Sequence, residues 1–150
     1  MSPTGTTTIA VAANKDVRVV EDAAYHIFYP HYATDTTTIC PLNRLFLHTI
    51  FTEKPWMEIV LGQSTNVAMV IVYNRQDAGG ERFHNALIEV AENNMWRACG
   101  FYKGPGVINQ IIFVICNKDV RGDTLKITLQ PVPGEKLAIN LCEVEVFEKV

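Results

Sequence analysis

Three basic side chains and one carboxylate stand at spacings that suit a polar binding site. His48 is followed by twenty-six residues and then Arg75, and Asp77 is followed by four residues and then Arg82. Converging guanidinium and imidazole groups can match the hydroxyl pattern of a neutral sugar, and Asp77 would hold one arginine through a charge-assisted hydrogen bond. The alternative is a solvated ion-pair loop over residues 75–82, with His48 as an ordinary loop residue.

Short runs rich in Val, Ile and aromatic residues predict the strands that position these side chains. Turn-forming clusters separate the runs, which is typical of an all-β sandwich or barrel. The predicted strands are Trp56–Leu61, Val67–Tyr73, Ala86–Ala91, Gln110–Cys116, Thr124–Leu129 and Leu137–Phe147. His48 precedes the first strand and Arg75 follows the second, so an antiparallel pair of these strands would bring both to one end of the fold.

The remaining segments predict one domain with a long functional loop. The stretch from Tyr25 to Leu47 has weak periodicity, so we expect a loop over one end of the sandwich, where long irregular loops usually carry function. Residues 14–25 have room for a turn or two of helix. A chain of 150 residues is the common size of a single domain. We expect the domain over residues 14–150, preceded by a flexible segment at residues 1–13 that carries no charged side chain.

Composition and charge exclude two classes of partner. The chain is 48% hydrophobic and 19% charged, and no apolar run approaches the ~20 residues needed to cross a bilayer, which excludes a membrane span. The net charge is -3, and the 13 Lys and Arg residues are dispersed along the sequence. This distribution lacks the basic footprint that binds a phosphate backbone, so nucleic acid is not expected as a partner.

Four cysteines form an even set without a close pair. They are Cys40, Cys99, Cys116 and Cys142. Their spacing argues against a zinc ribbon or a redox CxxC site. Two disulfides or four buried free thiols both agree with the count, because cysteine is also a common small core residue.

The His48, Arg75, Asp77 and Arg82 spacing resembles the signature of the F-type lectins, or fucolectins. The resemblance extends from about Val17 to Phe147 and includes Ala33–Asp35, Pro55–Trp56, Gly80–Arg82, Cys99–Gly100 and Leu141–Val146. It implies a jelly-roll-like β-sandwich of the galactose-binding or discoidin type. It also implies a secreted, non-enzymatic protein that binds terminal α-L-fucose on glycans. His48, Arg75 and Arg82 would bind the ring oxygen and the 3- and 4-hydroxyls, with Asp77 in support, and a small homo-oligomer would add avidity.

The chain departs from the family at the floor of the sugar site. Two adjacent cysteines of the family correspond to Ala78 and Gly79 here. A smaller apolar floor loses contact area, so the affinity would be lower or the ligand would be another sugar with similar hydroxyl stereochemistry. The resemblance also implies a Cys99–Cys116 disulfide, and a Cys40–Cys142 disulfide in which Cys40 acts from a displaced position because Phe46 stands where the family has a cysteine.

The resemblance further implies a structural calcium ion. Its candidate ligands are Asp35, Thr37, the Cys142 carbonyl and Glu143. Oxygen donors of this kind suit Ca²⁺. The loop departs from the family because it is shorter and has Tyr32 and Thr37 where the family has asparagine.

Two rival functions follow from other features. Asp77 and Glu81 are paired carboxylates of the kind that hydrolyse glycosides, but neighbouring arginines should lower their pKa values, whereas a general acid needs a raised pKa. A discoidin-like module that binds phospholipid head groups or a protein partner is the second rival. Exposed apolar loop tips would mark it, and Phe28–Tyr29 and Leu45–Leu47 are the candidates.

Overall fold

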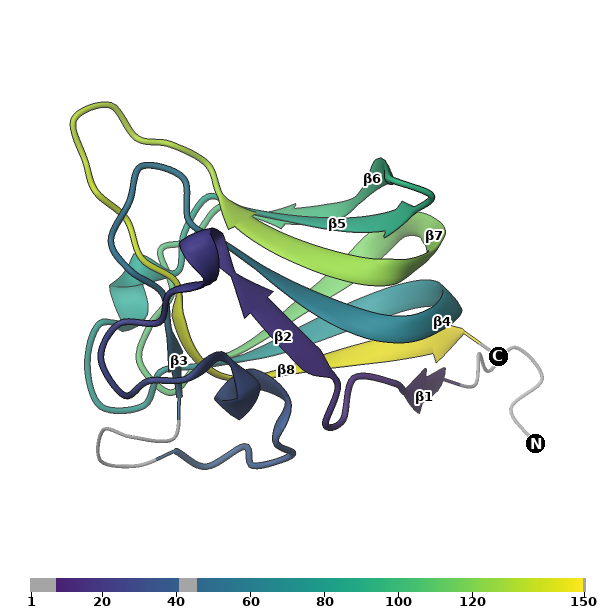
Figure 1. The fold of residues 1–150 in the computed structure, drawn as a ribbon, viewed down its shortest axis with the longest axis horizontal. Helices are drawn as coiled ribbons and strands as arrows, with labels where there is room; N and C mark the ends of the chain where they lie inside the picture. The colour runs from purple at the N-terminus through teal and green to yellow at the C-terminus, as the bar shows by residue number, and fades with distance from the viewer. Residues whose placement is uncertain (1–7, 41–45, 150) are drawn as a thin grey trace.

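The computed structural model describes residues 8–40 and 46–149, and within them the regular structure is almost entirely β-strand (Figure 1). The strands are β1 (Thr8–Ala10), β2 (Asp16–Val19), β3 (Leu47–His48), β4 (Trp56–Asn74), β5 (Ala86–Glu92), β6 (Met95–Tyr102), β7 (Ile111–Leu129) and β8 (Asn140–Lys149). Three short 3-10 turns, η1 (Val20–Asp22), η2 (Pro30–Thr34) and η3 (Gly80–Arg82), are the only helical elements among these residues. The predicted all-β fold is confirmed.

Two long strands, β4 and β7, run through both layers of the sandwich. Each has 19 residues, and they pair with each other along most of their length. The register shifts between Val60 and Thr65, where Gly62 has a φ of 88°. Gly122 lies against the Ala91 carbonyl so closely that a Cβ would not fit. The turn-forming residues 62–65 and 121–123 are therefore bends inside continuous strands. The four predicted strands Trp56–Leu61, Val67–Tyr73, Gln110–Cys116 and Thr124–Leu129 are parts of the two strands β4 and β7.

The bends divide one connected sheet into two layers. The strand order is β1-β8-β4-β7-β5-β6, with β2 paired to β4 and β3 paired to β8, and every pair is antiparallel. The first half of β4 and the second half of β7 lie with β2, β5 and β6. The second half of β4 and the first half of β7 lie with β1, β3 and β8. Figure 1 shows the two layers facing each other, which confirms the sandwich.

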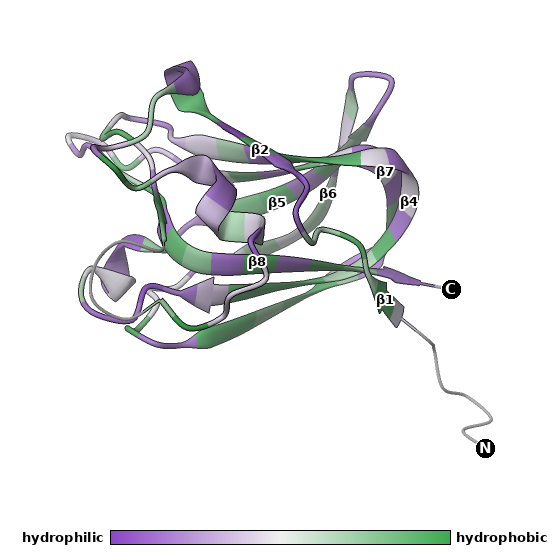
Figure 2. Ribbon diagram, turned by 60° about the horizontal axis from the view of Figure 1, so that its bottom comes forward, coloured by the Kyte–Doolittle hydropathy of each residue, from purple (hydrophilic) through white to green (hydrophobic). Residues whose placement is uncertain are grey.

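The core fills the space between the layers with alternate residues from each strand. Inward-facing members include Ile59, Val70, Ile88, Leu125 and Val144, each at most 1% exposed. Figure 2 shows apolar and polar segments alternating along several strands. Burying each such side chain contributes about 1.5–3 kcal/mol, and the two layers therefore hold the loops at their ends on a rigid base.

The domain begins earlier than the sequence predicts. Thr8–Ala10 pairs with Phe147–Lys149, and Ala12 is 2% exposed within the core. Residues 8–10 of the segment 1–13 that we expect to be flexible thus lie in the sheet, and residues 1–7 lie outside the described residues. The sequence does not predict three further strands, β2, β3 and β6, because none of them shows a clear apolar alternation.

The predicted long loop lies over one end of the sandwich, as Figure 1 shows. It contains η2, and its residues 41–45 lie outside the described residues. The turn expected within residues 14–25 is η1. Within residues 8–40 and 46–149, no helix has the length and apolar character needed to cross a membrane.

Candidate functional site

His48 is buried at one end of the sandwich in the neutral form. It lies on β3 opposite Asn140 of β8 and is 2% exposed. Its Nδ1 is 2.7 Å from the Thr49 carbonyl oxygen, so Nδ1 carries the proton and donates to that carbonyl. Burial, together with the charges of Arg82 and Arg75, lowers the pKa of His48 from 6.5 to about 4. The other nitrogen, Nε2, is left as an acceptor.

Arg82 reaches this acceptor from the end of η3. Its Nη1 lies 3.3 Å from His48 Nε2 and donates a 3.1 Å hydrogen bond to Asn140 Oδ1. Asn140 in turn donates from Nδ2 to the Gly79 carbonyl at 3.1 Å. Asn140 is fully buried, and its two hydrogen bonds fix both Arg82 and the loop that carries Arg82. The sequence gives no local signal for this role, because Asn140 and Arg82 are 58 residues apart.

Arg75 follows β4 and is held by a carboxylate. Its Nε donates to Asp77 Oδ1 at 2.6 Å, and its Nη2 lies 3.4 Å from Asp77 Oδ2. The hydrogen bond from Arg75 lowers the pKa of Asp77. The guanidinium carbon also lies 4.3 Å from the centre of the Phe46 ring. The Arg75 head group is therefore fixed on two sides, and its Nη1 has no hydrogen-bond partner among the described residues.

A second buried asparagine anchors the loop over residues 75–82. Asn74 is 1% exposed, and its Oδ1 accepts the Arg75 backbone N–H at 2.9 Å. Its Nδ2 donates to the carbonyls of Gly80 at 2.9 Å and Val107 at 3.0 Å. Every side-chain polar atom of Asn74 thus holds this loop or its neighbour in place.

Gly79 shows that the two arginines face the same small space. It has a φ of 68°, a conformation that favours glycine. A Cβ on Gly79 would lie 3.2 Å from Arg82 Nη1 and 3.4 Å from Arg75 Nη1. The structure therefore brings His48, Arg75 and Arg82 together. They meet through β3, β8 and the end of β4, not through the expected pair of strands, because residues 56–74 form one continuous strand.

Aromatic rings border the three basic residues. The rings of Tyr25 and Phe51 lie 4.8 Å and 5.4 Å from the His48 ring, and the Arg82 guanidinium lies 5.3 Å from the Phe51 ring. Tyr25 is 36% and Phe51 43% exposed. These two rings present apolar surface beside the polar groups, and no local pattern in the sequence marks them.

The apolar tips expected of a lipid-binding module are mostly covered. Phe46 and Leu47 are fully buried, and Phe28 stacks on Phe46 with 4.6 Å between ring centres. Tyr29 is 46% exposed, and Leu45 lies outside the described residues. These rings close the end of the sandwich, so few exposed apolar loop tips remain to favour phospholipid binding.

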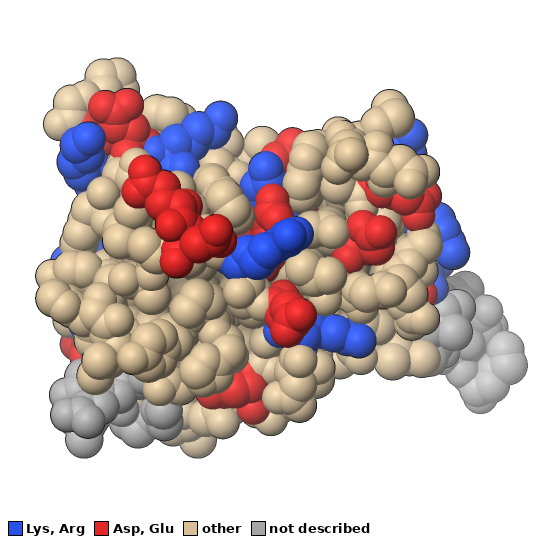
Figure 3. Space-filling view, in the orientation of Figure 1, with Lys and Arg blue, Asp and Glu red and all other residues tan. Residues whose placement is uncertain are grey.

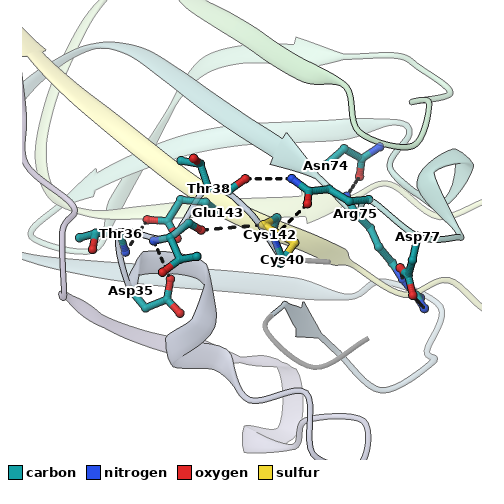
Figure 4. Close-up of a disulfide and its surroundings, with 11 residues drawn as sticks. Asp35, Thr36, Thr38, Cys40, Asn74, Arg75, Asp77, Cys142 and Glu143 are labelled. Carbon is teal, nitrogen blue, oxygen red and sulfur yellow. Dashed lines mark hydrogen bonds and ion pairs between the residues drawn. A yellow bond between two sulfur atoms is a disulfide. The ribbon is translucent and has the colours of Figure 1, made fainter. Parts of the chain in front are cut away.

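Both predicted disulfides are present. Cys99 bonds to Cys116, and Cys40 bonds to Cys142, so four free thiols are excluded. Figure 4 shows the Cys40–Cys142 bridge between the Glu143 side chain and the Arg75–Asp77 pair. Gln76 links the loop that follows β4 to the segment around Cys40. Its side chain accepts the Cys40 N–H at 2.9 Å and donates to the Thr38 carbonyl at 2.8 Å.

The proposed calcium ligands lie on the other side of that disulfide. Glu143 is 2% exposed; its Oε2 accepts the Thr36 N–H at 3.0 Å, whereas its Oε1 is buried with no hydrogen-bond partner among the described residues. Burial, then the neighbouring Asp35 side chain, raises the pKa of Glu143 to about 9. Thr37 is exposed and donates its N–H to Asp35 Oδ1 at 3.0 Å. The Cys142 sulfur lies 3.8 Å from the Thr37 carbonyl oxygen.

These residues offer a small set of oxygen donors. Across residues 8–40 and 46–149, no three His, Cys, Asp or Glu side chains gather as a metal-binding group. Calcium also takes carbonyl and hydroxyl oxygens, however, and an unpartnered buried carboxylate oxygen beside a second carboxylate suits a cation. The Asp35–Glu143 pair fits calcium on this ground.

Fold and site together define a β-sandwich binding domain with a polar recognition centre at one end. The chain belongs to the NedA-like, galactose-binding domain family of the F5/F8 type C group, whose model matches residues 32–137. No curated protein sequence matches the chain significantly.

Solved structures with the same fold include several lectins. A histidine mutant of the lectin-binding domain of lectinolysin, in complex with Lewis b, has a TM-score of 0.80 at 20% identity, with 97% of this chain and 100% of that chain covered. A fucose-binding module of Streptococcus pneumoniae has a TM-score of 0.78 at 22% identity, with coverage of 95% and 96%. A fucolectin from striped bass (Morone saxatilis) serum has a TM-score of 0.80 at 21% identity, with 97% of this chain and 49% of that chain covered. The predicted relation to the fucolectins is confirmed at the level of the fold.

Proposed function

We propose that this chain is a non-catalytic lectin that binds terminal α-L-fucose on glycans through His48, Arg75 and Arg82. The observation that carries the proposal is the convergence of the three side chains around Gly79. A neutral His48 accepts a hydroxyl hydrogen at Nε2, in place of the 3.3 Å contact with Arg82. The two guanidinium groups donate to the ring oxygen and to a neighbouring hydroxyl, as the family resemblance implies.

Asp77 and Asn140 support this site by orienting the donors. Asp77 fixes Arg75, and Asn140 fixes Arg82, before any ligand arrives. Preorganised donors lose little conformational entropy on binding, which matters for a ligand as small as one sugar ring. The arrangement therefore favours recognition of a hydroxyl pattern by geometry.

The half-exposed Tyr25 and Phe51 rings favour fucose as the ligand in this proposal. Fucose carries a 6-methyl group, and the missing side chain at Gly79 shifts its apolar contact toward these rings. L-Fucose and D-galactose share an axial 4-hydroxyl, whereas that hydroxyl is equatorial in glucose. We expect fucose first, galactose-like sugars next and glucose last.

The carboxylates near the site support a binding role over hydrolysis. Asp77 is paired with Arg75 and its pKa is lowered, which is the reverse of what a general acid needs. Glu81 is exposed at the surface of η3. Glu143 has a raised pKa, but it is 2% exposed and cannot reach a glycosidic oxygen.

The proposal includes a structural calcium ion and an extracellular setting. Asp35 and Glu143 would hold the ion with help from Thr37 and the Cys142 carbonyl, and the ion would supply the positive charge that the buried carboxylate lacks. Two disulfides support an oxidising compartment. In the view of Figure 3, Lys and Arg side chains are interspersed with Asp and Glu, which agrees with a glycan partner and not nucleic acid.

Calorimetry with fucose, galactose and glucose tests the proposal. Each arginine donates charged hydrogen bonds of ~1.5–3 kcal/mol, so Arg75→Ala or Arg82→Ala should weaken fucose binding by about tenfold or more, and His48→Ala by less. The matched control is Arg18→Ala. It removes an exposed arginine that is paired with Glu58, and both residues lie in the layer that does not contain His48. Equal fucose binding by parent and both site variants, or no sugar binding by the parent, would refute the lectin assignment.

A further inference from the structure

One stretch of β7 has apolar side chains on both of its faces. Ile112, Val114 and Cys116 face the core and are 3%, 6% and 7% exposed. The alternate residues Ile111, Phe113 and Ile115 face outward and are 49%, 61% and 70% exposed. An antiparallel sheet with a solvated outer face normally carries polar residues there. We call these three residues the outer β7 face.

The apolar surface continues onto β4 and reaches Phe147 on β8. Across the sheet, Ile111 pairs with Tyr73, Phe113 with Ile71 and Ile115 with Met69. In the next strand, β8, the corresponding positions are Glu143, Glu145 and Phe147. None of these nine positions is Lys or Arg, and the Glu145 carboxylate already accepts the Tyr73 hydroxyl at 2.9 Å.

We propose that the outer β7 face binds a second copy of this chain, so that the protein forms a symmetric dimer through two apposed sheet faces. The Ile-x-Phe-x-Ile pattern reads the same in both directions about Phe113. A two-fold axis at Phe113 sets Phe113 against its copy and Ile111 against Ile115, which is the self-matching that a two-fold interface requires. Packing of two sheets face to face is a standard arrangement.

The area of the face agrees with a dimer. Side chains exposed to this degree present roughly 400 Å² of apolar surface in each copy, about half of the ~800 Å² that each partner contributes to a standard interface. The more covered neighbours on β4 and β8 extend the contact.

Charge favours a second copy over a lipid surface. Peripheral membrane binding relies on basic residues around the apolar contact, because biological membranes are anionic. The positions paired with the outer β7 face on β4 and β8 are uncharged or acidic, the Lys149 ammonium at the end of β8 is paired with Asp119, and the chain has a net charge of -3. Two such faces do not repel each other at their centre, because the outer β7 face itself carries no charge.

Sedimentation velocity over a concentration series tests the dimer. We expect the parent to change from monomer to dimer, and Phe113→Lys and Ile115→Lys each to raise the dimer dissociation constant at least tenfold. The matched control is Met95→Lys on β6, which is 63% exposed and pairs with Glu92 at the β5–β6 hairpin; it should dimerise as the parent does. Unchanged melting temperatures show that the variants are folded, and Ile115→Lys decides the matter if Phe113→Lys unfolds.

Three results overturn the inference: a parent that stays monomeric at every concentration, variants that dimerise as tightly as the parent, or a monomeric parent whose binding to phosphatidylserine vesicles is lost in Phe113→Lys. The dimer is independent of sugar binding, and calorimetry with free fucose on the same variants keeps the two proposals apart. A monomeric Ile115→Lys should bind free fucose as the parent does. On a densely fucosylated surface it should bind at least tenfold more weakly, since a dimer presents two sites.

Discussion

His48 and Glu143 are both buried titratable residues, yet their surroundings differ in one respect. Burial disfavours the charged form of each, so the pKa of His48 falls to about 4 and the pKa of Glu143 rises to about 9. Both nitrogens of His48 have partners, in Thr49 and Arg82. Glu143 has a partner for Oε2 but none among the described residues for Oε1.

The difference indicates two kinds of site. Around His48 both ring nitrogens have partners, and Asn140 and Asp77 hold the arginines in place, so a neutral ligand meets a preorganised surface. Around Glu143 the network is open, and a proton or a cation must complete it. The Cys40–Cys142 disulfide lies between the Glu143 cluster and the Arg75–Asp77 pair (Figure 4).

The largest expected effect comes from removing that disulfide. Cys40 and Cys142 are 102 residues apart, so Cys40→Ala with Cys142→Ala should lower the free energy of unfolding by about 5 kcal/mol, whereas the 17-residue separation of Cys99 and Cys116 predicts about 3 kcal/mol. Urea denaturation measures both. Because Gln76 couples the disulfide loop to the sugar loop, the first variant should also bind fucose more weakly, and the second should not. Equal fucose binding by both variants would show that the two regions are uncoupled.

Acid should destabilise the His48 region next. The folded pKa of about 4 lies below the ordinary 6.5, so below pH 6.5 the unfolded chain binds a proton that the folded chain does not. The contribution of His48 is complete above pH 6.5, is lost as the pH falls toward 4, and amounts to about 3 kcal/mol. Unfolding measured between pH 7.5 and 4 should therefore show a smaller acid loss in His48→Gln than in the parent. His31→Gln, at an exposed position, should follow the parent.

A smaller effect is expected at Asn140. Asn140→Ala removes the acceptor of Arg82 and leaves the Gly79 carbonyl without its donor, which should cost about 1–3 kcal/mol of stability. Fucose affinity should fall as well, because Arg82 loses its orientation. Thermal melting and calorimetry check the two effects, with the exposed Asn117→Ala on β7 as control. Normal fucose binding by the variant would assign Asn140 to stability alone.

The smallest change in stability is expected from Glu143→Gln. An amide keeps the shape of the side chain without a buried charge, so in chelator the variant should stay within about 1 kcal/mol of the parent. Calcium should raise the melting temperature of the parent and of the control Glu148→Gln, but not that of Glu143→Gln. If calcium leaves the melting temperature of the parent unchanged, a proton alone satisfies the buried Glu143 carboxylate. Glu143 and His48 would then differ only in their protonation.

Local patterns in the sequence were enough to predict the fold and to mark the candidate recognition residues. Alternating apolar residues and turn clusters predicted the all-β sandwich, because strand periodicity is a local property. The spacing of His48, Arg75 and Arg82 predicted three basic groups at one end, and the structure brings them together around Gly79. The family resemblance supplied the two disulfide pairings, which the even cysteine count alone left open.

Other features depend on contacts between distant segments, and only the tertiary structure decided them. Asn140 supports Arg82 from 58 residues away, and Thr36 reaches Glu143 across 107 residues. The alternation in β8 predicts which residues share a face, but not that the loop after η2 buries Glu143. Residues 62–65 and 121–123 contain the glycines of a turn, yet pairing of β4 with β7 makes them bends in continuous strands. Sequence periodicity reports which way a side chain points, whereas packing against distant segments determines what it meets.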